Sequence, residues 1–253
     1  MADINVTSDY KKIANILGLL SAEDSGYIIT EVLNNETITE RLTFQFNFEL
    51  PYGKQQAVSL LFYNGLLTID SVKFNSYRFV IPNYVIKTMY WEYFRYLNET
   101  QSNIRYDNQK IDDAVIEMSE TGSVDKLVQY VQSVMKQLSN RDIENFTEKS
   151  LKMIFMTLLT GTPAYYVKSE TELQSGYADL VLRRTKINPG KHDFLIELKY
   201  IKQKELHKLD EFRESGLNQL KSYRAAFAVE EQKDLKAYLV IFFNRYEFVL
   251  MEV

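Results

Sequence analysis

Asp179, Glu197 and Lys199 are the residues whose types and spacing could carry chemistry. Residues 193–200 (DFLIELKY) alternate as a strand does, and this period places Glu197 and Lys199 on the same face. Asp179 lies in the middle of a second apolar run, residues 177–182 (YADLVL). The two runs together predict two neighbouring strands that carry two carboxylates and an amine.

Asn188-Pro189-Gly190, between the two runs, is a strong turn signal and predicts a hairpin. The hairpin would bring Asp179 close to Glu197 and Lys199. Two carboxylates that face each other are costly to bury unless a cation lies between them, and Mg²⁺ is the usual occupant of an all-oxygen site. Such residues also occur on solvated sheet faces as plain salt bridges, and these three alone favour that interpretation.

The composition is that of an ordinary soluble globular protein. A chain of 253 residues with 45% hydrophobic and 25% charged residues can form one large or two modest domains. The absence of cysteine excludes disulfides, thiolate metal sites and thiol nucleophiles, and the two histidines leave little scope for a zinc site. No apolar stretch approaches 18 residues and the N-terminus does not resemble a secretory signal. We expect a bacterial-type cytoplasmic setting without a membrane span.

The charge distribution is uneven along the chain. A net charge of −4 argues against broad non-specific binding of nucleic acid. Residues 183–208, however, contain eight basic and three acidic residues, a local net charge of +5. This basic segment is either a solvated hairpin tip and helix start, which the count slightly favours, or a phosphate-attracting rim around Asp179 and Glu197. The basic residues are Arg183, Arg184, Lys186, Lys191, Lys199, Lys202, Lys204 and Lys208.

The first half of the chain is predicted to be an α+β unit with a winged-helix-like order of elements. Such units bind DNA or serve as lids and docking modules, and the scarcity of basic residues favours the second role. A further possibility is that this half performs the binding and the nuclease-like half supports it, which predicts DNA binding by residues 1–110 alone. The expected elements are helices 12–20, 54–63 and 84–97, and strands 40–50, 66–69 and 77–81.

The second half follows a polar stretch, residues 98–110, that we interpret as a linker. Residues 237–243 (AYLVIFF) are apolar without alternation, which predicts a strand covered on both faces. The expected elements are helices 111–119, 124–138, 142–160 and 211–229, and strands 164–169, 177–183, 193–200, 236–243 and 246–252.

Three further residues could address the same site. Glu148 lies on the helix before the strands, and Gln219 and Tyr223 are spaced i, i+4 on the helix after them, so that they share one face. Each has an ordinary alternative: Glu148 can simply favour the helix N-terminal dipole, Gln219 can be a surface amide, and Tyr223 a half-buried ring. Taken singly, each residue favours that alternative.

Together these positions resemble a known arrangement. The order helix, three strands, helix, strand, with Glu148, Asp179, Glu197-Leu198-Lys199 and Gln219-x-x-x-Tyr223, resembles the PD-(D/E)XK nuclease superfamily, and its Gln-x-x-x-Tyr element the RecB-like branch. More closely, the chain is similar to the bacterial family in which this domain follows an AAA-ATPase-like domain. The motifs are FTEKSLKMIFMTLL, SGYADLVL, FLIELKY and LNQLKSY across roughly 140–253, with LLFYNGLLTID and YRFVIPNYVIK resembling the end of the ATPase-like region.

The resemblance implies an activity and roles for these residues. Asp179, Glu197 and the backbone carbonyl of Leu198 would hold Mg²⁺ or Mn²⁺, and Glu148 would bind through water or assist a second ion. Lys199 would orient the attacking water and offset negative charge, and Gln219 and Tyr223 would position that water or a phosphate oxygen. The implied partner is nucleic acid, with DNA favoured, alongside an ATPase domain or another protein.

Two departures from the family pattern limit the resemblance. No G-x-x-x-x-G-K-[S/T] motif is present, since Gly53-Lys54 lacks the upstream glycine, so this chain cannot act as an ATPase alone. We expect either a fragment of a longer protein or a truncated relative. The family often has a basic residue where this chain has Tyr177, which removes the basis for a phosphate contact there but not for metal binding.

The sequence thus predicts an α+β or α/β chain with two regions. Residues 1–110 are expected to be winged-helix-like, and residues 111–253 to have a restriction-endonuclease-like fold, a central mixed sheet flanked by helices. The predicted function is that of a metal-dependent nuclease. The alternative is a catalytically silent module of the same fold that binds protein or nucleic acid, and metal-dependent thermal stabilisation lost on Asp179→Ala would distinguish the two.

Overall fold

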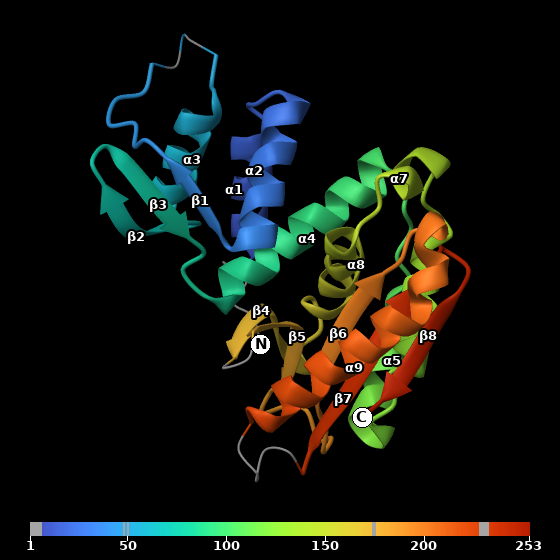
Figure 1. The fold of residues 1–253 in the computed structure, drawn as a ribbon. Helices are drawn as coiled ribbons and strands as arrows, with labels where there is room; N and C mark the ends of the chain where they lie inside the picture. The colour runs from blue at the N-terminus through green and yellow to red at the C-terminus, as the bar shows by residue number, and fades with distance from the viewer. Residues whose placement is uncertain (1–6, 48, 50, 174–175, 228–232) are drawn as a thin grey trace. The chain divides into compact units, whose positions relative to one another are not determined.

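The computed structural model divides into two compact units, Met1–Gln101 and Ser102–Val253, whose elements are labelled in Figure 1. The structure describes residues 7–47, 49, 51–173, 176–227 and 233–253. The boundary between the units lies between Gln101 and Ser102, ahead of the helix α5 (Asn108–Thr121). The boundary predicted from the sequence is at residue 110. Which function belongs to each unit stays a prediction.

The first unit is an α+β structure with a small antiparallel sheet in the order β1-β3-β2. Phe79 on the central strand is fully buried and packs against Phe62, with ring centroids 5.6 Å apart. Helix α3 has the predicted bounds. The elements are α1 (Thr7–Leu17), α2 (Ala22–Asn35), β1 (Thr37–Glu40), α3 (Lys54–Tyr63), β2 (Thr68–Lys73), β3 (Ser76–Val80) and α4 (Tyr84–Gln101).

The start of the chain differs from the sequence-based expectation. The helix predicted over 12–20 ends at Leu17, because the chain turns at Gly18, a residue that commonly ends helices. Helix α2 was not predicted at all. Its start is marked by Ser21, whose side chain accepts a hydrogen bond from Asp24 N at 3.1 Å, so an N-cap signal was present in the sequence.

The strand predicted over 40–50 is wrong for the described residues, since only Glu40 belongs to a strand; residues 48 and 50 lie outside the described part. Phe44 does not face a core, since it is 71% exposed. Side chains of α3 take the place of a partner strand: Ser59 Oγ accepts from Thr43 N at 2.9 Å, and Gln55 donates to Thr43 Oγ1 at 3.0 Å.

The second unit contains a five-stranded mixed sheet, as predicted, and the structure gives its strand order as β4-β5-β6-β7-β8. Only β6 and β7 run parallel, and they are joined through α9. The elements after α5 are α6 (Asp125–Met135), α7 (Asn140–Glu144), α8 (Glu148–Leu159), β4 (Tyr165–Leu173), β5 (Gly176–Arg184), β6 (Asp193–Tyr200), the 3₁₀ helix η1 (Gln203–Lys208), α9 (Leu209–Ala225), β7 (Leu235–Phe242) and β8 (Phe248–Glu252).

Several predicted bounds in this unit need correction. The helix predicted over 142–160 is two helices, because Ser139 and Thr147 each cap a separate helix start. The predicted linker 98–110 is shorter, since α4 and α5 leave only residues 102–107 between them. Helix α9 ends at Ala225, before the predicted end at 229, and residues 228–229 lie outside the described part.

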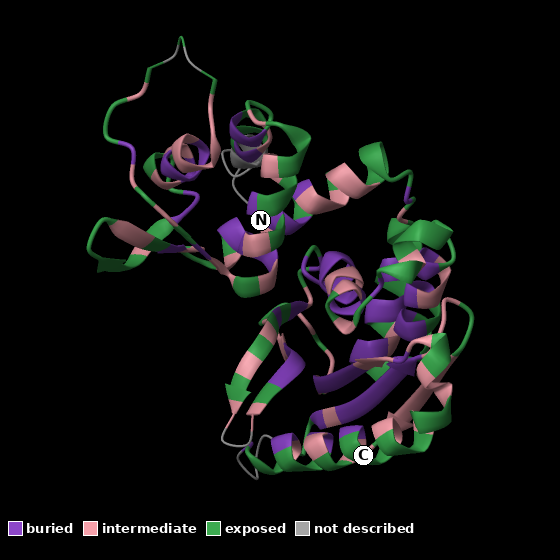
Figure 2. Ribbon diagram, turned by 45° about the horizontal axis from the view of Figure 1, so that its top comes forward, coloured by how far each residue is buried: buried purple, intermediate pink, exposed green. Residues whose placement is uncertain are grey.

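Helices cover both faces of the larger sheet. Ala237, Leu239 and Ile241 of β7 belong to the apolar cluster that includes Leu220 and Tyr223 of α9. The alternate residue Tyr238 faces the other way and donates a hydrogen bond to Gly122 O at the end of α5, at 2.7 Å. Figure 1 shows α9 across one face of the sheet, and Figure 2 shows the central strands buried. The unbroken apolar run of β7 is therefore confirmed as a strand covered on both sides.

Helix α9 lies so close to β7 at Gly216 that an added Cβ would be 2.7 Å from Leu239 Cδ1. Leu239 is fully buried and has little room to move. We expect Gly216→Ala to destabilise the second unit by about 1–2 kcal/mol, because overpacking outweighs the gain in helix propensity. Urea denaturation would measure this change.

Gly26→Ala is the matched control, because Gly26 lies within α2 and nothing lies within 4 Å of its added Cβ. That variant should be neutral or slightly stabilising. Equal effects of the two alanines on the denaturation midpoint would contradict the close approach of α9 to the sheet.

No helix in the described part of the chain is long and apolar enough to cross a membrane.

Candidate active site

The hairpin of β5 and β6 brings Asp179 and Glu197 to one face of the sheet. Val181 and Leu195 are antiparallel partners, and both pack in the cluster under α9. Asp179 and Glu197 lie two residues further along their strands, which returns them to this same face. The predicted juxtaposition is therefore present.

Asp179 holds the end of this strand pair together. Its side chain is 8% exposed, and Oδ2 accepts a hydrogen bond from Leu198 N at 2.9 Å. Burial raises the pKa of Asp179, while the Leu198 N–H and Lys199 lower it, and the net direction is upward. The hydrogen bond from Leu198 N thus stabilises the charged form of Asp179, while burial destabilises it by more.

Glu197 and Lys199 form a close ion pair on β6. Lys199 Nζ donates to Glu197 Oε1 at 2.7 Å. The other oxygen, Glu197 Oε2, is buried and has no hydrogen-bond partner among the described residues. Burial and then the charge of Asp179 raise the pKa of Glu197 to about 7. Burial lowers the pKa of Lys199, but the charges of Glu197 and Glu148 raise it by more. The net direction is upward, so the ammonium form is favoured.

Glu148 reaches the same group of residues from α8. It is the first residue of that helix, capped by Thr147, and its Oε1 lies 3.8 Å from Lys199 Nζ. Burial raises its pKa, and the nearby charge of Asp179 adds to this rise. Glu148 therefore favours the helix dipole and also faces the site, so the two interpretations are compatible.

Tyr223 and Gln219 both lie on α9. Tyr223 is 5% exposed, and its hydroxyl lies so close to Gly176 that an added Cβ there would be 3.0 Å away. Burial raises the pKa of Tyr223, and the charge of Glu197 adds to this rise. Gln219 Oε1 is buried without a hydrogen-bond partner among the described residues. A half-buried ring and a surface amide are therefore inadequate descriptions of these two side chains.

Lys152 and Glu170 belong to the same group, although the sequence analysis did not select them. Lys152 is 6% exposed, pairs with Glu170, and lies one turn after Glu148 on α8. The register of β4 and β5 places Glu170 opposite Asp179, where its backbone has a left-handed φ of 49°. The i, i+4 spacing of Glu148 and Lys152 was the available signal, but a pair like this is ordinary on solvated helices.

The group of charged residues has an excess of negative charge that fits a divalent cation. Four carboxylates face two ammonium groups, which leaves a formal charge of −2 when all are ionised. The orphaned Glu197 Oε2 and the all-oxygen donor set suit Mg²⁺ or Mn²⁺, which bind through one or two carboxylates and retain several waters. Among the described residues no group of three or more carboxylate or histidine side chains is placed to hold a metal ion. The carboxylates are Glu148, Glu170, Asp179 and Glu197, and the ammonium groups are Lys152 and Lys199.

The basic segment 183–208 does not form one continuous rim around this group. Arg183 and Arg184 lie at the other end of β5, about 13 Å along the strand from Asp179. Both pair with Asp193, at 3.1 and 2.9 Å, and Arg184 also contacts Asp234. For these two residues the interpretation as a structural hairpin end is supported.

The turn between β5 and β6 falls at residues 186–187, where Asn188 N donates to Thr185 O at 3.2 Å, so it precedes the predicted Asn188-Pro189-Gly190. Asn188 Oδ1 accepts from Gly190 N at 2.8 Å, and a Cβ at Gly190 would overlap with Ser119 of α5. The connection therefore packs on α5, away from the charged group.

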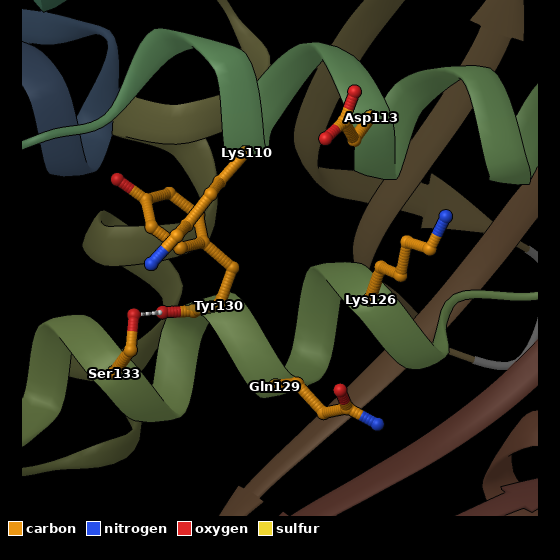
Figure 3. Close-up of a pocket in the computed structure, with 6 residues that line it drawn as sticks. All are labelled: Lys110, Asp113, Lys126, Gln129, Tyr130 and Ser133. Atoms are coloured by element: carbon orange, nitrogen blue, oxygen red, sulfur yellow. Dashed lines mark hydrogen bonds between the residues drawn. The ribbon is translucent and has the colours of Figure 1, made fainter.

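A separate surface hollow of about 260 Å³ lies between α5 and α6 (Figure 3). Its lining is polar, and Ser133 Oγ is occupied by a 2.7 Å hydrogen bond to Tyr130 O. It contains none of the residues of the charged group. The hollow is lined by Lys110, Asp113, Lys126, Gln129, Tyr130 and Ser133.

Comparison with protein families gives a match within the second unit. Residues 146–252 match the sequence model of the PD-(D/E)XK nuclease superfamily. This region contains all seven predicted site residues, Leu198 included, and the five-stranded sheet. No curated protein matches the chain. The match to the nuclease superfamily indicates nuclease activity and a nucleic-acid substrate for this region.

Proposed function

We propose that the second unit is a metal-dependent phosphodiesterase that hydrolyses nucleic acid, with DNA as the favoured substrate. The observation that carries this proposal is the buried Glu197 Oε2 beside Asp179 and next to the Lys199 ammonium, an oxygen without a hydrogen-bond partner in the described part of the chain. An unpaired carboxylate oxygen in such a site is costly unless a cation completes it. The match of residues 146–252 to the nuclease superfamily supports the reaction class.

Asp179, Glu197 and the backbone carbonyl of Leu198 are the groups that would hold Mg²⁺ or Mn²⁺, with Glu148 assisting through water. A divalent ion supplies Lewis-acid polarisation of the phosphate and a lowered pKa of bound water. In the hydrolysis, a water oxygen forms the new bond to phosphorus, the bond to one ester oxygen breaks, and that oxygen takes up a proton.

Lys199 orients the attacking water in this proposal. Its ammonium group has three N–H donors, and one of them is used by Glu197 Oε1. The remaining donors can hold water or a phosphate oxygen, and the positive charge offsets the negative charge that develops there. Glu148, at 3.8 Å from Nζ, is too distant for a hydrogen bond but favours the ammonium form.

Gln219 and Tyr223 position water or a phosphate oxygen from the side of α9. The buried free oxygen of Gln219 and the Tyr223 hydroxyl above Gly176 support this role. Their Gln-x-x-x-Tyr spacing supports membership of the RecB-like branch. The winged-helix-like order of the first unit, and an ATPase-like partner, belong to the same proposal.

A catalytically silent module is the second candidate, and one feature favours it. Lys199 and Lys152 already pair with Glu197 and Glu170, so part of the buried charge is neutralised within the chain. Tyr177, 57% exposed, also stands where a basic residue would help to bind phosphate. This candidate predicts binding of protein or nucleic acid without cleavage.

Cleavage of labelled single-stranded, duplex and branched DNA, with Mg²⁺ or Mn²⁺, tests the proposal on wild type beside Lys199→Ala. We expect metal-dependent cutting that the variant loses. Lys204→Ala, which removes an exposed lysine from η1, is the matched control and should retain activity. Equal cutting by wild type and Lys199→Ala would refute the assigned role of Lys199. Absence of cutting on every substrate would favour the silent module or a nuclease that needs an ATPase partner.

A further inference from the structure

Phe74, at the tip of the β2–β3 hairpin, has a conformation that the fold does not explain. Lys73 and Ser76 are register partners, so Phe74 and Asn75 form a two-residue loop. Phe74 has a left-handed φ of 54°, and its side chain is 95% exposed. Glycine is the usual residue at such a turn position, because a bulky side chain there is strained. The ring therefore adds strain and gains no packing in return, which points to a use outside the folded unit.

Cations lie around this ring on the outer face of the small sheet. In β3 the side chain of Phe79 faces the core, so the alternating residue Arg78 faces outward. Arg78 pairs across the sheet with Thr39 and Ser71, and Lys73 is at the end of β2. Together with Arg41 they line an open hollow of about 560 Å³. We call Arg41, Lys73, Phe74 and Arg78 the basic-aromatic surface.

The positive charge of this surface contrasts with the rest of its unit. Residues 1–101 contain eight basic and eleven acidic residues, a net charge of −3, yet three of the eight basic residues line this one hollow. Arg78 contacts Asp70 at 3.3 Å, but both side chains are about half exposed, and such pairs contribute little and exchange readily. The surface therefore attracts anions in a unit that as a whole would repel them.

We propose that the basic-aromatic surface binds single-stranded nucleic acid, with a base stacked on Phe74 and phosphates held by Arg41, Lys73 and Arg78. An exposed ring among cations is the combination that single strands use, because each unpaired base offers a face for stacking. The hollow also offers the hydroxyls of Thr39, Ser71 and Ser76 to the backbone. A duplex hides its base faces, so it would engage the cations but not the ring. The binding itself does not depend on the proposed nuclease function; only its interpretation as substrate recognition rests on that function.

Fluorescence anisotropy with a labelled oligothymidylate, in EDTA, measures this binding on the full chain without any cleavage. We expect Phe74→Gly to weaken binding between about 5-fold and 100-fold. Because glycine relieves the left-handed strain, the same variant should not melt earlier than wild type, and we expect a rise of about 1–3 °C in Tm. Loss of affinity together with retained or raised stability cannot come from unfolding.

Arg41→Ala combined with Lys73→Ala tests the cations separately. We expect the slope of log affinity against log salt concentration to fall by about 1.4, since each phosphate contact on a single strand contributes about 0.7. Lys11→Ala combined with Lys12→Ala removes the same charge from α1 and is the matched control; it should leave the slope unchanged. Phe44→Ala removes another exposed ring of this unit and should retain affinity.

Competition with duplex DNA and with RNA of the same length completes the experiment. Single-stranded RNA should compete as unlabelled single-stranded DNA does. The duplex should compete at least 10-fold less well than either single strand. Unchanged affinity of Phe74→Gly, an equal loss in Phe44→Ala, or preference for the duplex would each overturn the proposal. Because binding is read without metal, failure here leaves the cleavage result unaffected, and failure of cleavage leaves this result unaffected.

Discussion

Glu197→Gln is expected to abolish cleavage of nucleic acid and, in metal-free buffer above pH 7, to raise the stability of the protein. Gln can still accept the hydrogen bond from Lys199 Nζ that Glu197 Oε1 accepts at 2.7 Å. The variant loses the negative charge that a divalent cation requires, so cleavage should fall by about 1,000-fold or more. The same loss removes a buried charge that the fold disfavours.

The pH dependence of the stability difference follows from the raised pKa of Glu197. Its folded-state pKa of about 7 lies above the ordinary value of 4.5. Between these values the folded protein binds a proton that the unfolded chain has released, so wild-type stability falls as pH rises through this window. The penalty is fully present above pH 7 and absent below pH 4.5. Glu197→Gln lacks this penalty, so its advantage should grow from near zero at pH 4.5 to on the order of 1–3 kcal/mol at pH 8.

Thermal melts from pH 4.5 to 8 in EDTA, alongside cleavage assays with Mg²⁺, measure both effects. Glu172→Gln is the matched control, because Glu172 is exposed on the neighbouring strand β4 and faces Tyr177 in register. It should change neither activity nor the pH profile of stability. An active Glu197→Gln enzyme, or one less stable than wild type at pH 8, would contradict the assigned role of this carboxylate.

The pairing of Asp179 with Glu197 was predictable because a strand period is strict. A shift of one residue in β6 would turn Glu197 and Lys199 away from Asp179, and the alternation in 193–200 leaves little room for that shift. The short connection between the strands, with its turn at residues 186–187, makes β5 and β6 antiparallel neighbours. Local pattern and tertiary structure agree here, so sequence reasoning succeeds.

Lys152 and Glu170 could not be found in this way. Their pairing joins a helix to a strand, and no local period connects the two. Glu170 acquires its position from the register of β4 with β5, which no pattern within β4 alone predicts. Glu148 is an intermediate case. The sequence indicates the start of its helix through the capping residue Thr147, but it does not predict the contact of Glu148 with Lys199.

The incorrect strand over 40–50 shows the opposite failure, in which a local pattern was present without tertiary support. Phe44 and Phe46 alternate with polar residues, yet no strand lies beside this part of the chain among the described residues. The backbone at Thr43 instead bonds to the Ser59 side chain of α3. Alternation predicts a strand only where a neighbouring strand exists to satisfy its backbone.

Asp179→Asn is expected to remove the stabilisation that Mg²⁺ or Mn²⁺ gives to the wild-type protein. A cation held by Asp179 and Glu197 binds the folded state alone, and at a concentration about 100 times its dissociation constant it stabilises by about 2.7 kcal/mol. For a protein of this size that corresponds to a rise of about 5–10 °C in Tm. Asn retains an oxygen that can accept from Leu198 N, so the strand pair should survive the substitution.

Melting curves with and without the metal, at a fixed pH near 7.5, measure the shift for each variant. Asp210→Asn is the control, since that carboxylate is 93% exposed at the start of α9 and should leave the metal-induced shift intact. A shift retained in Asp179→Asn would mean that the ion binds elsewhere, and a wild-type protein that does not respond to metal would remove the basis for the proposed site. Asp179→Asn alone should lose both the metal-induced shift in Tm and the cleavage activity. That result would mean that metal binding and the reaction use the same buried pair of carboxylates, because both would depend on the charge of Asp179.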